Sequence, residues 1–243
     1  MNEVGSKGTG LVVSAHSADF VWRAGGAIAL YAKRGWQIKV VCLSFGERGE
    51  SQKLWKEPGM TLDRVKSGRR AEAERAAGIL GAAGIEFFDL GDYPLRTNLD
   101  ALEKLADIYC ALRPAWVLAH SLDDPYNFDH PEATRFAQEA RVVAQAHGRK
   151  GAAVALGAPP VFLFEPHQPE QCGWKPQLIL DISEVWDVKR KAFESMDAQQ
   201  HLWEYYTRVA LQRGSQGARN SDRKMQYGEA YQRVFPTVAE CFV

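Results

Sequence analysis

The chain of 243 residues is 46% hydrophobic and 25% charged, which is the composition of an ordinary globular protein. Its 30 basic and 30 acidic side chains give zero net charge, so a nucleic-acid or membrane-surface role, which needs a basic excess, is not expected. No apolar run approaches the roughly 20 residues of a membrane span, and residues 1–10 lack the pattern of a secretion signal.

The 4 cysteines lie far apart and lack the C-x-x-C spacing of zinc ribbons and thioredoxin-like sites. Cys42 and Cys110 fall inside apolar segments, where a cysteine acts as a small buried hydrophobic side chain. Unpaired cysteines of this kind are typical of a reducing compartment. We therefore expect a cytoplasmic protein.

Strand and helix patterns alternate along the first 166 residues. Short apolar segments predict buried parallel strands at 10–15, 37–45, 85–91, 115–120 and 159–166. Helical spacing and capping signals predict helices at 25–35, 64–84, 98–113 and 130–146. Repeated units of a strand and a helix predict an α/β fold with a mostly parallel sheet, right-handed crossovers and helices on both faces.

The remainder of the chain follows a different pattern. Residues 175–183 can form a strand, and residues 184–214 predict a long amphipathic helix, either whole or broken. We expect one domain, with a core at 1–166 and a helical C-terminal elaboration at 167–243. The apolar content of residues 184–214 also predicts self-association, so a homo-oligomer is expected.

Acidic, amide and histidine side chains follow all five predicted strands of the core. In open α/β sheets, ligands bind outside the carboxyl ends of the strands, so these side chains should gather at one edge. Such an accumulation indicates a functional site. In chain order they are His16, Asp19, Glu47, Glu50, Asp89, Asp92, His120, Asp123, Asp124, Asn127, Asp129, His130, Glu165 and His167.

His16, Asp19 and His130 stand out among these side chains. Two histidines and one carboxylate form a common metal site, which zinc accepts with open positions for water and substrate, and which also suits manganese or ferrous iron. Taken singly, His16 would end a strand and Asp19 would cap the next helix. Together with His130 they predict a divalent metal site, first of all for zinc, with Asp129 as a partner that orients His130.

Several segments resemble motifs of the PIG-L/LmbE family, which is best known for zinc-dependent N-acetylglucosaminyl deacetylases. The family's A-H-P-D-D-x-x-x-x-x-G-G resembles AHSADFVWRAGG, its T-x-G-E-x-G resembles LSFGERGE, and its H-P-D-H-x-x-A resembles NFDHPEA. Its R-x-x-E-A-x-x-A-A-x-x-L-G helix resembles RRAEAERAAGILG, and its C-terminal pieces resemble DISEVWDVKRKAF and YGEAYQRVF. The resemblance covers nearly the whole chain. It implies a Rossmann-like three-layer sandwich that holds a metal through His16, Asp19 and His130.

Two departures from these motifs bear on the chemistry. Ala18 stands where the deacetylases have the acid that serves as general base, and a methyl group accepts no proton. Asn127 stands where they have a histidine that helps to stabilise the oxyanion, and an amide cannot carry a positive charge. Loss of a general base typically costs a factor of about 10²–10⁴. Metal ligands that remain while both hydrolytic roles are weakened indicate different chemistry on the same metal site.

The segment SAHSADFVWRAGG resembles, in particular, one branch of the family, the metal-dependent hydratases of bacterial gallate and protocatechuate breakdown. This resemblance implies a hydro-lyase that adds water across a carbon–carbon double bond of an unsaturated oxo-polycarboxylate. Two alternatives stay open. One is an N-deacetylase that recruits another base, such as Glu47 or Asp124, and the other is a non-catalytic metal-binding protein of the same fold.

The remaining polar residues receive candidate roles. Glu47 is the first candidate for acid–base catalysis, because its loop opens at the end of the second strand. Asp124, His167 and Glu50 are the next candidates. A substrate with several carboxylates needs bidentate arginine partners. The candidates for substrate binding are Arg48, Arg69, Asn127 and His120, with Arg213, Arg219 and Arg223 of the C-terminal segment behind the first two arginines.

Overall fold

The structure, a computed structural model, describes residues 7–149 and 155–238. Its strands are β1 (Thr9–Ser14), β2 (Gln37–Cys42), β3 (Gly84–Phe87), β4 (Trp116–Ala119), β5 (Val161–Phe164), β6 (Leu178–Asp181) and β7 (Gly228–Arg233). Its α-helices are α1 (Asp19–Lys33), α2 (Gln52–Trp55), α3 (Leu62–Leu80), α4 (Leu99–Leu112), α5 (Asp129–Ala144), α6 (Trp186–Glu194) and α7 (Trp203–Arg219). Its short 3-10 helices are η1 (Pro169–Cys172), η2 (Ser183–Val185) and η3 (Asp197–Leu202).

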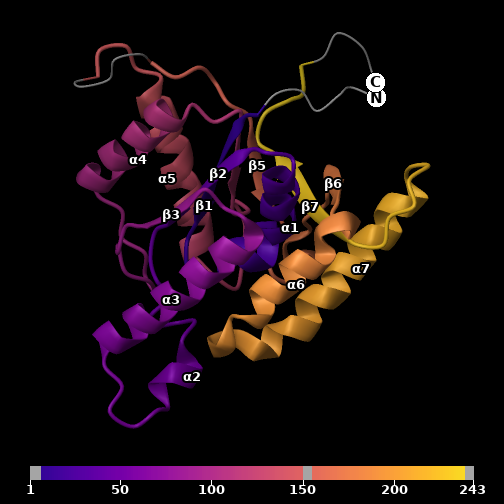
Figure 1. The fold of residues 1–243 in the computed structure, drawn as a ribbon. Coiled ribbons are helices and arrows are strands. Elements are labelled where there is room, and N and C mark those ends of the chain that lie inside the picture. Colours follow the sequence, from indigo (N-terminus) through magenta and orange to yellow (C-terminus); the bar gives the residue numbers. More distant parts are fainter. Residues whose placement is uncertain (1–6, 150–154, 239–243) are drawn as a thin grey trace.

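These strands form one sheet in the order β3-β2-β1-β4-β5-β7-β6 (Figure 1). The strands from β3 to β5 pair in parallel, whereas β7 runs antiparallel to both β5 and β6. Helices α4 and α5 lie on one face of the sheet, and α1, α3 and α6 lie on the other. The predicted three-layer α/β sandwich with a mostly parallel sheet is confirmed.

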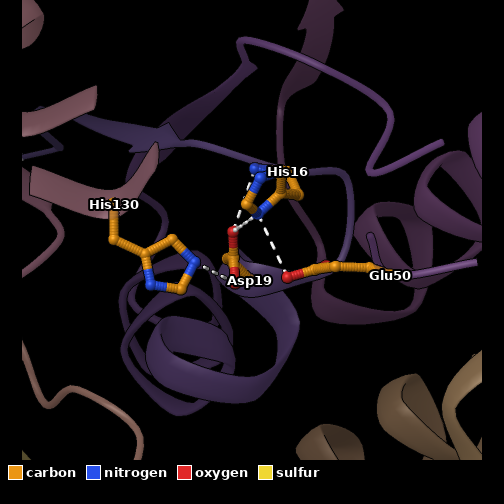
Figure 2. A group of neighbouring side chains, drawn as sticks. All are labelled: His16, Asp19, Glu50 and His130. Carbon is orange, nitrogen blue, oxygen red and sulfur yellow. Dashed lines mark hydrogen bonds and ion pairs between the residues drawn. The ribbon is translucent and has the colours of Figure 1, made fainter. Parts of the chain in front are cut away.

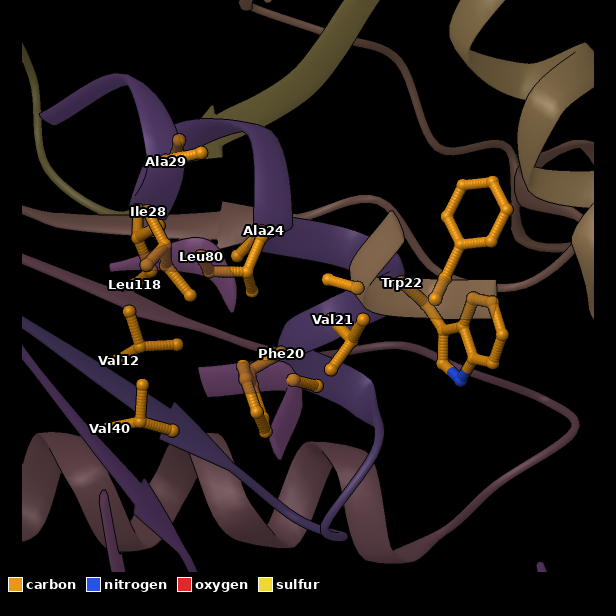
Figure 3. Packing of buried hydrophobic residues seen from close by; sticks show 14 of the residues in the cluster. Val12, Phe20, Val21, Trp22, Ala24, Ile28, Ala29, Val40, Leu80 and Leu118 are labelled. Carbon is orange, nitrogen blue, oxygen red and sulfur yellow. The ribbon is translucent and has the colours of Figure 1, made fainter. Parts of the chain in front are cut away.

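A hydrophobic core lies on each side of the sheet, because successive side chains of a strand point to opposite faces. Val12 and Val40 pack with Phe20 and Ile28 of α1 (Figure 3). Val13 belongs to the other core, beneath α4 and α5. Burial of one such side chain stabilises the fold by about 1.5–3 kcal/mol. Strand β1 is therefore held from both faces, and the residues that follow it start from a fixed position.

Helix α1 begins at Asp19, well before the predicted start at residue 25, so its two glycines lie inside the helix. A Cβ atom at Gly26 would lie 2.6 Å from Ile182 Cγ2 and 2.8 Å from Glu229 Oε1. The Glu229 carboxylate accepts the backbone N–H of Gly26 at 2.6 Å. The glycine therefore permits a close approach between α1 and the C-terminal part of the chain, and it does not mark the start of a helix.

The predicted helix at 184–214 is broken into α6, η3 and α7, with Gln199 at the non-helical angles φ −127° and ψ 35°. Strand β6 agrees with the predicted strand at 175–183. The sequence does not predict β7, because its segment GEAYQR lacks the polar and apolar alternation of a strand. Since one sheet takes strands from both parts of the chain, we propose that the chain forms a single domain. In the part of the chain that the structure describes, none of the helices is both long and apolar enough to cross a bilayer.

Candidate metal centre

The predicted metal ligands meet at the carboxyl ends of β1 and β4. At this point the strand order reverses, because β2 and β3 lie on one side of β1 while β4 and β5 lie on the other. Such a switch point is where α/β sheets bind their ligands. His16 and Asp19 follow β1, and His130 lies in the first turn of α5 (Figure 2).

Four side chains offer ligand atoms that all lie within 4.8 Å of one another: His16, Asp19, Glu50 and His130. His16 Nδ1 lies 3.1 Å from Asp19 Oδ2 and 3.1 Å from Glu50 Oε1. His130 Nε2 lies 3.4 Å from Asp19 Oδ1. Both His130 Nε2 and Glu50 Oε2 are buried and make no hydrogen bond to the described residues. Because buried polar atoms are rarely left without a partner, this arrangement fits a divalent cation between the two histidines and the acids.

Carboxylates fix the outward-facing nitrogens of both histidines. Asp129 Oδ2 lies 3.1 Å from His16 Nε2, and the same carboxylate accepts the backbone N–H groups of Tyr93 and Leu95 at 2.8 Å each. The prediction that Asp129 orients His130 is therefore wrong. It is Asp124 that lies against His130, with Oδ2 at 2.7 Å from Nδ1. Such carboxylates set the tautomer and the orientation of a metal-binding imidazole.

The charges of this cluster favour a cation. Burial opposes protonation of His16, but the carboxylates of Glu50, Asp129 and Asp19 outweigh it and raise the pKa of the imidazole well above its usual value. Burial alone would raise the pKa of Asp19, but its interactions with His130 and His120 lower that pKa well below the usual value. The carboxylates thus favour a positive charge at the position of His16, and the histidines favour an ionised Asp19. A divalent metal bound at this position would supply the positive charge in place of the proton on His16.

Beside these ligands lies a cavity of about 170 Å³. Of the predicted site residues, Asp124, Asn127 and His167 line it together with Asp19 and His130. Asn127 Nδ2 donates a hydrogen bond to the hydroxyl of Tyr93 at 2.8 Å. The other residues that line the cavity are Trp22, Arg23, Glu50, Tyr93, Tyr126, Gln199, Leu202 and Tyr206.

Glu47 and Arg48 lie outside the lining of this cavity. Glu47 is only 1% exposed, and its carboxylate accepts the backbone N–H of Phe45 at 3.2 Å. Burial, followed by the nearby Asp92, raises the pKa of Glu47. Arg48 donates through its guanidinium to the backbone carbonyl of Asp92 at 3.0 Å. Glu47 and Arg48 belong to the loop after β2. The acid of this loop that lines the cavity is Glu50, three positions after Glu47.

Arg69 is fully buried and holds neighbouring protein groups rather than lining the cavity. Its guanidinium donates to Glu72 Oε2 at 2.6 Å and to Gln199 Oε1 at 3.2 Å. Glu72 Oε1 accepts the backbone N–H of Ala198 at 3.0 Å, so the pair holds η3 in place. Trp22 Nε1 also donates to Gln199 Oε1, at 3.2 Å. Gln199, whose oxygen is bound by these two donors, lines the cavity.

His120 also lies behind the cavity. It is fully buried, its ring stacks on that of His130 at 4.1 Å between centroids, and its Nε2 accepts the backbone N–H of Ala15 at 2.9 Å. Burial, followed by the neighbouring His130, lowers its pKa well below the usual value, so the ring is neutral. His120 therefore packs against a predicted ligand instead of facing the cavity.

Sequence reasoning overlooks Arg23 and Gln199 and gives Glu50 too low a rank. Arg23 follows Asp19 by four residues, and residues with that spacing share a face of a helix, but the predicted helix begins only at residue 25 and so does not include them. Gln199 carries no comparable signal, because η3 reaches the cavity through contacts with α3. Ala18 is fully buried, and neither its methyl group nor its backbone offers a base for the cavity.

Known proteins resemble this chain in sequence and in structure. The chain is 61% identical to the 4-oxalmesaconate hydratase of Pseudomonas putida strain KT2440 over 234 residues, which cover 95% of this chain and 90% of that protein. The crystal structure of GalB, the 4-carboxy-2-hydroxymuconate hydratase of the same strain, matches with a TM-score of 0.94 and 60% identity, over 97% of this chain and 100% of that one.

A more distant relative is the diacetylchitobiose deacetylase of Thermococcus kodakarensis, which is 26% identical over 84% of this chain and 77% of its own length. Residues 11–141 match the PIG-L family, described as GlcNAc-PI de-N-acetylase. That segment contains the proposed ligands from both strand ends. Together with the geometry of the site, these matches confirm the resemblance seen in the sequence: the chain belongs to the PIG-L family.

Proposed function

We propose that the protein is a metal-dependent hydratase, a hydro-lyase that adds water to 4-oxalomesaconate or to its enol, 4-carboxy-2-hydroxymuconate. The product is 4-carboxy-4-hydroxy-2-oxoadipate, an intermediate of aromatic-acid catabolism. The observation that carries the proposal is a cluster of side chains that could hold a metal ion, together with the fully buried methyl group of Ala18. Amide hydrolysis would need a base at that position. The high identity to a 4-oxalmesaconate hydratase supports the same conclusion.

His16, Asp19 and His130 are the residues that would hold the metal, with zinc as the first candidate and manganese or ferrous iron as alternatives. When bound, a divalent metal supplies Lewis acidity, which polarises the oxo group of the substrate and lowers the pKa of a water molecule. Asp129 and Asp124 then act as positioning residues, because each lies against the free nitrogen of one histidine.

Glu50 is the proposed general base. Its Oε1 lies 3.1 Å from His16 Nδ1, while its Oε2 is buried without a hydrogen-bond partner among the described residues, and the side chain lines the cavity. The carboxylate can therefore accept a proton from a water molecule held between it and the ligand cluster. The hydroxyl oxygen forms a bond to C4 of the substrate as the proton passes to Glu50.

His167 is the proposed proton donor. It lines the same cavity, and its ring lies 4.4 Å from that of Tyr205 and 6.2 Å from that of Tyr126. Protonated His167 delivers its proton to the carbon next to C4, which completes the addition of water to the double bond. Solvent then returns a proton to His167 and removes one from Glu50.

The proposal is tested by incubation of the metal-loaded protein with 4-oxalomesaconate. We expect loss of the ultraviolet absorbance of the conjugated system, formation of the hydrated acid by NMR, and loss of both signals after treatment with a chelator. An absence of metal-dependent turnover would contradict the proposed function. The same preparation without substrate, analysed for bound metal, identifies the ion.

The oligomeric state and the cellular location complete the proposal. A homo-oligomer is supported by apolar side chains that remain about two-fifths exposed, such as Leu178 (42%) and Leu211 (40%). A cytoplasmic location is supported by Cys42, Cys110 and Cys172, which are free thiols. Sedimentation velocity measures the first feature, and fractionation of the producing cells measures the second.

A further inference from the structure

We propose that Arg23 is a substrate-binding residue, whose guanidinium binds a carboxylate of the substrate remote from the metal and so selects polycarboxylates. The inference rests on the proposed function for the identity of the substrate. The position of Arg23, its unused hydrogen-bond donors and the state of the neighbouring acids each support it.

Arg23 occupies a position that a substrate at the metal centre would reach. It lies on α1 four residues after Asp19, so the two side chains share one face of the helix, and its Nε is 3.6 Å from Asp19 Oδ1. Among the described residues that line the cavity, Arg23 is the sole lysine or arginine. It is only 8% exposed, so its charge is largely shielded from bulk solvent.

The guanidinium leaves most of its hydrogen-bonding capacity unused. An arginine has five N–H donors. NH1 donates to the backbone carbonyl of Glu165 at 2.8 Å, whereas Nε is buried and has no partner among the described residues. The Asp19 and Asp124 oxygens, at 3.6 and 3.8 Å, lie beyond hydrogen-bond distance. The two carboxylates therefore form ion pairs with Arg23 but leave its Nε without an acceptor among the described residues. A buried donor without an acceptor is costly, which points to an oxygen of an anionic ligand as its partner.

The acids around Arg23 are already engaged elsewhere. The Glu165 carboxylate is bound by the fork of Arg213, through Nε at 2.9 Å and through NH2. Asp124 is hydrogen-bonded to His130 at 2.7 Å, and Asp19 faces the histidines. Arg213, which the sequence suggested as a substrate partner, is therefore already paired with Glu165. Arg23 remains the arginine at the cavity that can bind a ligand.

Charge balance in the cavity favours the same role. Asp19, Glu50 and Asp124 line the cavity with carboxylates, which would repel a substrate that carries several carboxylates of its own. A divalent metal held by His16, Asp19 and His130 would offset part of that repulsion. The planar fork of Arg23 matches a carboxylate in a bidentate manner and would offset it at the end of the substrate remote from the metal.

Binding of two matched acids tests the proposal without turnover. The probes are 2-oxoadipate and 2-oxohexanoate, which share the 2-oxo carboxylate end and differ in the distal carboxylate. Isothermal titration of the zinc-loaded wild type should give a Kd about 10- to 100-fold lower for 2-oxoadipate. Arg23→Gln should abolish this preference and leave the Kd of 2-oxohexanoate unchanged, and Arg23→Lys should retain part of it.

The control is Arg208→Gln, which changes an arginine on α7 whose side chain is 69% exposed, and which should keep the full preference. A wild type that binds the two acids equally would overturn the proposal even if Arg23→Gln fails to fold. A variant that weakens both acids by the same factor would also overturn it, since that result indicates a structural role. A retained preference with no hydration of 4-oxalomesaconate would contradict the proposed function and leave the role of Arg23 standing.

Discussion

The two walls of the cavity are built in different ways. The metal wall consists of side chains from short segments at the ends of β1 and β4, held by carboxylates nearby. The second wall, called the far wall, is formed by His167, Gln199, Leu202 and Tyr206, which come from the chain after β5 and from η3 and α7. The first wall carries the metal ligands, and the second carries the proposed proton donor His167 and shapes the space for the substrate. We therefore expect changes in the metal wall to abolish turnover, and changes in the far wall other than at His167 to alter substrate affinity.

The largest effect should follow from His16→Ala, which removes a central ligand of the metal wall. We expect loss of the bound metal and a fall in kcat/KM of at least about 10³-fold, because a Lewis acid contributes several kcal/mol to such reactions. Metal content by atomic absorption and turnover by absorbance measure the two losses. His147→Ala, at an exposed position after α5, is the matched control and should keep both. A metal-free but fully active His16→Ala protein would show that the metal wall is not the reaction centre.

The next effect concerns the two acids of the loop after β2. Glu50→Gln should lower kcat by about 10²–10⁴-fold while the metal is retained, because the amide cannot accept a proton. Glu47→Gln should lower kcat by less than about 10-fold, since Glu47 lies outside the cavity lining and bonds to the backbone. The reverse order of effects would return Glu47 to the role that the sequence first suggested.

The sequence predicts those site residues that lie close together along the chain or at predicted strand ends, and it misses those that reach the site only through the folded structure. His16 and Asp19 lie in one motif at one strand end, so their proximity follows from local spacing, and the topology rule then adds His130. Arg69 illustrates the limit. Its motif marks it as important, but only the folded structure shows that its guanidinium holds Glu72 and Gln199. Gln199 itself gives no signal, because a break between two helices reaches the cavity only through long-range contacts.

A pH profile of the reaction tests whether His167, a residue of the far wall, is the proton donor. Burial, followed by the charge of Arg23, lowers the pKa of His167 below its usual 6.5 in the free protein. A donor must be protonated, so kcat/KM should fall as the pH rises through that lowered value. Substrate carboxylates favour the protonated ring, so the corresponding limb of kcat should lie at higher pH. His167→Asn should remove the limb and lower kcat by about 10²-fold; a variant with an unchanged limb would exclude His167 as the donor.

Asp129→Asn should have a smaller effect, confined to the metal wall. The amide can still accept the backbone N–H groups of Tyr93 and Leu95, but it no longer offers a charged partner to His16. Loss of such an outer carboxylate typically costs about 10- to 100-fold in metal affinity. Competition with a chromophoric chelator measures this change. Unchanged metal affinity would mean that the 3.1 Å contact does not orient the ligand.

The smallest effect should come from Glu72→Gln, which weakens the support of the far wall without touching the metal wall. The substitution removes the charge that pairs with the buried Arg69 and weakens the acceptor for the backbone of Ala198, so η3 and Gln199 lose their fixed position. We expect the free energy of unfolding to fall by about 1–3 kcal/mol. The KM should rise by about 3- to 10-fold with little change in kcat, as for a loss of uniform binding. Glu74→Gln is the matched control on the same helix, because its partner Arg70 lies 3.6 Å away at the surface. If Glu72→Gln lowered kcat and left KM unchanged, η3 and Gln199 would take part in the reaction itself, and their assignment to substrate binding would be wrong.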